Sequence, residues 1–354
     1  MVRDQFRWSA ISFSRRLLRQ RIARTEWEAL SAWRGLVHQA YQGQPIQPNL
    51  CSDLWHHSRF QNPSARKAFF TPNRREREAS SHHYGHDIQL KRYAGIPLVG
   101  PPLPVLLEHG LKVSEGARFE TPKAWAHRGY LCMGPLRARW LREQHQVPAR
   151  AIGPWIQFAQ PLLNSHQLKK QRQCWGKTLL VVLAHSWDQV ERSMDQQACV
   201  DAVKTLAEER NYQQVVWLRH WKDPEFLPLP KHWISACNGH RSNPWFLDAL
   251  RTLLELCDGV ASNAFGTHLG YAAALNKQLH WIDVAAEQNL SHLSSDKAAE
   301  EDAEWQERQR LSTALQEALC MPPSRQQHAV QTLVEPYWGL SLKPTPADVK
   351  SWLI

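Results

Sequence analysis

The residues best suited to chemistry follow short apolar runs, at points where a strand would end in a loop. Glu108 and His109 come directly after the apolar run 105–107 and precede Gly110. A carboxylate or an imidazole at a strand end can take a proton from a substrate hydroxyl, so both are candidate catalytic bases. Ordinary surface groups beside a turn would show the same pattern, and the sequence leaves both interpretations open.

A second candidate site spans residues 262–272, where a strand-like pattern changes into a helical one. Gly266 allows close approach of a ligand to the backbone, and a helix that begins there presents free N–H groups and a positive dipole end. The segment therefore predicts a phosphate site. Its candidate binding residues are Ser262, Asn263, Gly266, Thr267 and His268. The alternative is an ordinary strand-to-helix turn, because one glycine is a weak signal.

A parallel sheet is needed to bring such residues together, and residues 178–283 predict one. Strand-like runs occupy residues 178–184, 214–219, 232–237, 259–262 and 278–283, with helical patterns at 199–210, 246–257 and 266–275. Asn243 and Pro244 predict the start of the second helix. Small residues at 270, 272 and 273 would let the third helix pack closely. This alternation indicates a doubly wound parallel sheet.

In such a sheet, ligands bind at the carboxyl ends of the strands. That rule adds candidates after three of the predicted strands. They are His185, Ser186 and Asp188, then His220 and Asp223, then Asn238 to Arg241, which include His240.

The rest of the chain predicts a smaller α/β unit and several connections. Strand patterns at 105–107, 129–132 and 150–152, with a helix at 136–144, indicate a first α/β domain. The polar stretch 164–177 predicts a linker, and the charged stretch 296–319 predicts a helix on the outside. Residues 26–41 predict a helix and 44–81 a loop.

The length of 354 residues suggests two domains. We expect an N-terminal helical and irregular extension at 1–90, a first Rossmann-like domain at 91–165, a second at 176–342 and a tail at 343–354. The longest apolar runs are far below the roughly 20 residues of a membrane-spanning helix. The Arg-rich start lacks the apolar stretch of an export signal, so a cytoplasmic protein is expected.

The net charge of +10 favours anionic partners. Seven arginines between residues 3 and 24, interleaved with apolar residues, predict either contact with an anionic membrane surface or a solvated arm. The 17 Trp raise the possibility of nucleic-acid binding, but Trp217, Trp233, Trp245 and Trp281 fall in predicted elements and suit a core better.

Several kinds of site are excluded by the motifs. The seven cysteines are scattered without a Cys-x-x-Cys pair, which predicts reduced thiols and no zinc or iron–sulfur site. The histidine-rich stretch 82–87 lacks the i, i+4 spacing of a helical metal site. Neither a P-loop, a His-Glu-x-x-His motif nor a complete dinucleotide fingerprint is present.

Several of these blocks resemble GT-B-type glycosyltransferase-like proteins of bacterial surface-polysaccharide (capsule and O-antigen) biosynthesis. The blocks lie at 106–110, 152–156, 178–186, 246–258, 262–272 and 337–339, so the resemblance covers residues 91–342. Residues 183–184 are Leu-Ala where the family often has Pro-Ser. Residues 276–278 are Asn-Lys-Gln where Gly-Lys-Pro is usual.

The resemblance implies two Rossmann-like domains facing a cleft and a metal-independent sugar transfer without a cofactor. The nucleotide-sugar donor would bind mainly the second domain, and a surface-polysaccharide or lipid-linked glycan acceptor mainly the first. Glu108 or His109 would deprotonate the acceptor hydroxyl. Further donor-site candidates are His185, Ser186, His240, Arg241, Asp283 and Glu287. Through its Arg-rich N-terminus, such a protein could also lie peripherally at the inner face of the membrane.

Two other functions remain open from sequence. One is a nucleotide-sugar epimerase of the same fold, which would act on the donor without an acceptor. The other is a basic nucleic-acid-binding module, which predicts a steep salt dependence and aromatic residues along a basic groove.

Overall fold

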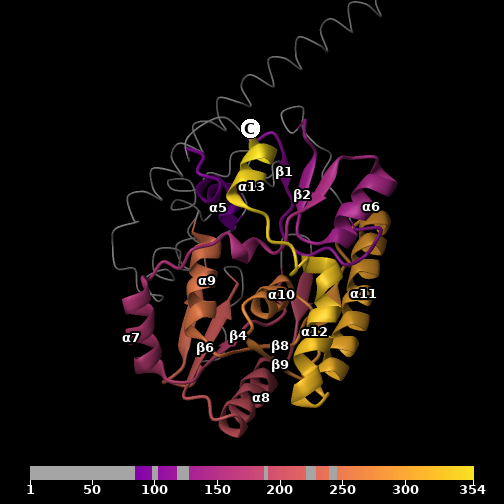
Figure 1. The fold of residues 1–354 in the computed structure, drawn as a ribbon. Helices are drawn as coiled ribbons and strands as arrows, with labels where there is room; N and C mark the ends of the chain where they lie inside the picture. Colours follow the sequence, from indigo (N-terminus) through magenta and orange to yellow (C-terminus); the bar gives the residue numbers. More distant parts are fainter. Residues whose placement is uncertain (1–83, 98–102, 118–126, 187–189, 221–228, 239–244) are drawn as a thin grey trace, which may run out of the picture.

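The computed structural model describes residues 84–97, 103–117, 127–186, 190–220, 229–238 and 245–354 (Figure 1). The predicted helix at 26–41, the loop at 44–81 and the Arg-rich start lie outside these ranges. So do the candidate residues Asp188, Asp223, His240 and Arg241.

The larger of two parallel sheets contains the strands predicted for the second half of the chain. They are β4 (Thr178–Val181), β6 (Gln214–Arg219), β7 (Ile234–Cys237), β8 (Gly259–Ser262) and β9 (Gln278–Trp281). The order is β7-β6-β4-β8-β9, with every pairing parallel. Helices α8 (Gln196–Glu209), α9 (Phe246–Leu256) and α10 (Thr267–Ala274) connect the strands. The expected parallel α/β architecture is confirmed.

The smaller sheet has three short parallel strands in the order β1-β2-β3. They are β1 (Leu106–Leu107), β2 (Tyr130–Cys132) and β3 (Ala149–Ala151), and helix α6 (Pro135–His145) joins the last two. Each matches a predicted element to within a few residues. The short helix η2 (Trp155–Gln157) follows β3.

One hydrophobic core extends through both sheets. Leu107 and Leu131 of the smaller sheet belong to the same cluster of buried side chains as Leu180 and Val260 of the larger sheet. Helix α5 (His86–Tyr93), which includes residues expected in the N-terminal extension, contributes the fully buried Leu90. The domain boundaries stay predictions, because apolar packing is continuous where the chain passes from one sheet to the other.

The predicted linker at 164–177 is wrong in part, because it forms helix α7 (Ser165–Trp175). Asn164 and Gln167 make a capping box at its start. No residue of α7 is buried, as the polar composition indicated, but Arg172 ties it to α9 by donating to the carbonyl of Glu255 at 2.7 Å.

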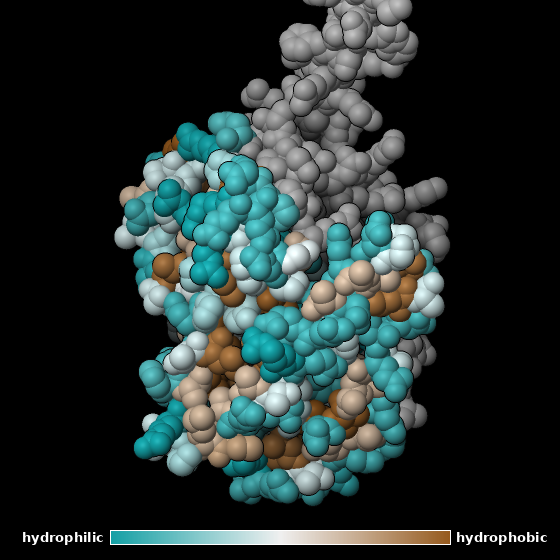
Figure 2. Space-filling view, turned by 90° about the vertical axis from the view of Figure 1, so that its right-hand side faces the viewer, coloured by the Kyte–Doolittle hydropathy of each residue, from teal (hydrophilic) through white to brown (hydrophobic). Residues whose placement is uncertain are grey.

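The prediction of a charged helix at 296–319 on the outside is confirmed for one side of the helix. Helix α11 (Ser295–Leu319) runs beside α12 (Pro323–Trp338) along the right-hand side of Figure 1. The face of the molecule seen in Figure 2 is hydrophilic over much of its area, with hydrophobic patches between. Another side of α11 is buried, however, and holds Glu304, Leu311, Ser312, Leu315 and Ala318.

The end of the chain returns to the smaller sheet. After Gly339, helix α13 (Pro346–Leu353) buries Val349 and Leu353, and Tyr93 of α5 donates to the carbonyl of Pro344 at 2.8 Å. An antiparallel ribbon of β5 (Glu191–Ser193) and β10 (Glu287–Asn289) is a further element that the sequence did not predict. Within the described ranges, no helix combines the length and apolarity needed to cross a bilayer.

Candidate functional site

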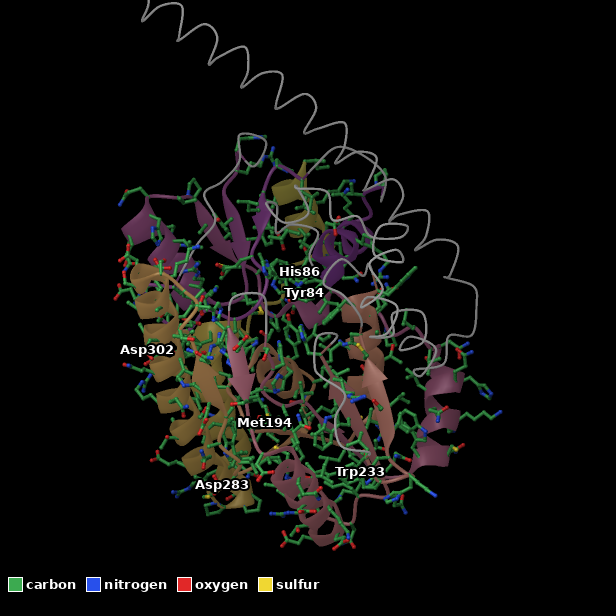
Figure 3. The ribbon with its side chains drawn as sticks, turned by 180° about the vertical axis from the view of Figure 1, so that it is seen from behind. Tyr84, His86, Met194, Trp233, Asp283 and Asp302 are labelled. Carbon is green, nitrogen blue, oxygen red and sulfur yellow. The ribbon has the colours of Figure 1, made fainter. Side chains whose placement is uncertain are left out.

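A cavity of about 730 Å³ lies between the two sheets. Residues at or just beyond the carboxyl end of every strand of the larger sheet line it, and residues 108–112 after β1 line it from the smaller sheet. In Figure 3, Tyr84 and His86 lie toward the smaller sheet, and Met194 and Asp283 lie with the larger one. The strand-end rule therefore predicted the place of the cavity.

The turn from β8 into α10 forms one wall of this cavity. Ser262 is fully buried, and its hydroxyl lies 2.8 Å from Nε2 of His268. The His268 ring packs over Gly266, where an added Cβ would lie 2.7 Å from the ring. A side chain at this position would displace the imidazole, so glycine leaves room for the ring of His268.

Asn263 connects strand ends and is not available as a ligand donor. Its Oδ1 accepts from the backbone N–H of Ala184 at 2.8 Å, and its Nδ2 donates to the carbonyl of Val284 at 3.0 Å. These bonds join the loops after β4, β8 and β9. Ser262 and Asn263 thus bond groups within the fold, and their predicted role as phosphate-binding side chains stays a prediction.

In the first turn of α10, the N–H of Leu269 donates to the carbonyl of Gly266 at 3.1 Å, whereas the N–H groups of Thr267 and His268 have no partner among the bonds of the described residues. Its N-cap is Gly266, and no side chain caps the helix. Thr267 and His268 line the cavity, so the positive end of the helix opens toward it. Trp338 holds this turn in place, because its Nε1 donates to the carbonyl of Thr267 at 3.1 Å and its ring lies against Gly270. The predicted close packing at 270 is confirmed.

Two imidazoles in the cavity wall are held in the neutral form. Burial, followed by Arg192, lowers the pKa of His185 to about 4. Burial, His185 and Arg308 lower the pKa of His268 to about 3. The His185 ring stacks on His220, with 4.3 Å between centroids. Desolvation and neighbouring cations both oppose protonation, so the histidines add no charge at neutral pH.

Arg192 supplies a cation that the sequence analysis missed. Its guanidinium lies 4.7 Å above the ring of Trp305, and Nη2 donates to Oε1 of Gln288 at 3.2 Å. Among the described residues, Nε of Arg192 has no hydrogen-bond partner. Burial and Arg308 lower the pKa of Arg192 to about 10, so it stays charged at neutral pH. A half-buried guanidinium whose Nε donor is unused favours an anion in the cavity.

The opposite wall carries the two predicted catalytic residues. Oε1 of Glu108 accepts hydrogen bonds from Nε and Nη2 of Arg137, at 2.9 and 2.7 Å. Arg137 is almost fully buried, so the ion pair fixes the carboxylate at the cavity wall. His109 also lines the cavity, 5.7 Å from the ring of Tyr84 between centroids.

The remaining donor-site candidates divide into two groups. Asp283 lines the cavity at its exposed edge. Ser186 instead bonds the backbone of Arg192, accepting from its N–H at 2.9 Å, and Glu287 is exposed in β10. Ser186 and Glu287 are thus in structural positions outside the cavity wall. Trp217, Trp233 and Trp245 are buried as predicted, whereas Trp281 lines the cavity.

Helix α11 also lines the cavity, which the sequence did not predict. Glu301, Glu304, Trp305, Arg308 and Ser312 of α11 line the cavity at spacings of three and four residues. This spacing was readable in the sequence, but a polar helical stripe is also typical of a solvent-facing surface.

In the described part of the chain, no group of three or more His, Cys, Asp or Glu is arranged to hold a metal ion. Neither a protein-family model nor a curated protein matches this chain.

Proposed function

We propose that the protein is a glycosyltransferase that binds a nucleotide-sugar donor in the cavity between the two sheets. One observation carries the proposal: the uncapped first turn of α10 opens into this cavity, which Arg192 also lines with an unused Nε donor. Backbone N–H groups at a helix start and a guanidinium are two standard ligands for a diphosphate.

The proposed reaction uses both walls. Glu108 or His109 takes the proton of an acceptor hydroxyl as its oxygen bonds to the anomeric carbon. The bond from that carbon to the phosphate breaks, and the nucleoside diphosphate leaves with the electron pair. Arg192 and the first turn of α10 stabilise the charge that develops on it. The acceptor is a hydroxyl of a surface-polysaccharide or lipid-linked glycan, as the family resemblance implies.

The test is a thermal-shift panel of the full chain with UDP, GDP, ADP, TDP and CMP. We expect one nucleotide to raise Tm, since a ligand at 100 times its Kd stabilises a fold by about 2.7 kcal/mol. Gly266→Asp should abolish the shift, because it displaces His268 and adds a negative charge at the helix start. Gly116→Asp is the matched control, because a Cβ at this exposed glycine meets nothing within 4 Å. A wild-type chain that responds to none of the five nucleotides would refute the proposal.

A further inference from the structure

Two loops that face the cavity follow strands of different sheets, and the ion pair of Glu304 and Arg308 forms hydrogen bonds to both of them. The first loop, residues 108–114, follows β1 and carries Glu108 and His109. The second, residues 263–266, leads from β8 into α10. Glu304 and Arg308, one turn apart on α11, reach these loops from between the sheets.

Glu304 is bound on both carboxylate oxygens. Oε1 accepts from the backbone N–H of Val113 at 3.0 Å, and Oε2 accepts from the N–H and the hydroxyl of Ser114 at 2.9 and 2.7 Å. Burial by itself would raise the pKa of Glu304, but Arg308, Lys112 and these hydrogen bonds hold it below the usual value. The carboxylate therefore stays ionised and holds the end of the first loop.

Arg308 completes the connection. Its Nη2 donates to Oε1 of Glu304 at 2.9 Å and to the carbonyl of Leu111 at 2.6 Å. Its Nη1 donates to the carbonyl of Phe265, next to Gly266, at 2.6 Å. One guanidinium thus bonds both loops, and its planar fork sets the direction of each bond.

A second ion pair on α11 provides a comparison within the same helix. Arg310 and Glu307 pair at 2.6 Å, with the Arg310 side chain 63% exposed. That pair touches neither loop. Burying Glu304 costs solvation free energy, so its position is explained by what it bonds and not by the stability of α11.

We propose that Glu304 and Arg308 are positioning residues that fix the distance between the Glu108–His109 loop and the first turn of α10. The inference rests on the proposed function, since it sets the separation of the catalytic bases from the diphosphate. Glu304 need not touch substrate, because its oxygens are already used by the protein.

Hydrogen–deuterium exchange of the full chain without ligand tests the connection. In Glu304→Ala, we expect exchange to rise at least tenfold in residues 111–116 and also in residues 264–269, which Glu304 does not contact. Glu304→Gln keeps an acceptor oxygen and should rescue most of both changes. Arg310→Ala should leave both segments unchanged. A rise confined to residues 111–116 would overturn the proposal, as would equal behaviour of Ala and Gln.

Nucleotide affinity provides a second measurement, with UDP, GDP, ADP, TDP and CMP titrated in turn. For any that binds the wild-type chain, Glu304→Ala should weaken binding at least tenfold and Arg310→Ala less than twofold. Unchanged affinity in Glu304→Ala would count against the positioning role. If the wild-type chain binds none of them, the proposed function fails, and the exchange experiment alone decides whether the two loops are coupled.

Discussion

The loop after β8 and the loop after β1 face the same cavity, but their polar groups are held in different ways. After β8, Ser262 and Asn263 are bonded within the fold, and the free donors belong to the backbone of α10. After β1, a charged side chain, Glu108, stays at the cavity wall because Arg137 pairs with it. Position at a strand end therefore predicts which residues approach a ligand, but not which atoms remain available to it.

The charged groups on the two sides also differ, although Lys112 lines the cavity beside Glu108 and Asp283 lines it from the larger sheet. The α10 side presents a helix start and Arg192, with its histidines neutral. The β1 side presents a carboxylate. In the proposed reaction, the first side would face the donor phosphates and the second the acceptor hydroxyl. Each of the three experiments below changes residues on one side of the cavity.

The largest effect is expected on the α10 side, from Trp338→Ala. The change removes the ring that packs against Gly270 and the donor to the Thr267 carbonyl. We expect the free energy of unfolding to fall by about 4 kcal/mol, the range for truncating a buried Trp. Chemical denaturation measures it. Trp338→Phe keeps most of the packing and should lose about half as much; equal losses would show that ring packing does not support this turn.

Arg137→Ala changes the β1 side. Removing one partner of a buried ion pair leaves the other charge uncompensated, which costs about 3 kcal/mol. Arg137→Met combined with Glu108→Gln removes both charges and should recover most of this loss in the same denaturation assay. If the double variant is no more stable than Arg137→Ala, the pair does not hold the β1 side as described.

The smallest effect concerns pH. His185 and His268 have folded pKa values of about 4 and 3, below the ordinary value of 6.5. The unfolded chain therefore binds protons that the folded chain does not, and stability falls as pH drops below 6.5. We expect a loss of about 2 kcal/mol between pH 7 and pH 5, after allowing for partial exposure.

Replacing both histidines with Gln should flatten this slope, measured by denaturation at a series of pH values. His166→Gln, at an exposed position in α7, is the control. A wild-type stability that does not change between pH 7 and pH 5 would contradict the neutral state of the two imidazoles.

Most of the strands and helices in the described ranges could be predicted from the sequence, because their signals are local. An apolar run predicted β8 at its observed bounds, and helical spacing predicted α9 to within a residue. The linker prediction was wrong in part because Asn164 and Gln167, only three residues apart, form a capping box that starts a helix. Helix α11 was assigned to the outside because polar residues normally face water.

The sequence by itself determined the alternation of strands and helices, and with it the end of the sheet where the cavity lies. Only the tertiary structure decided which polar atoms remain available there. Glu304 bonds a backbone N–H 191 residues away, and Arg308 a carbonyl 197 residues away. The periodicity of a sequence indicates whether a position faces water or the core. A buried polar group, however, needs a hydrogen bond to one particular partner. That partner becomes its neighbour only when the chain has folded.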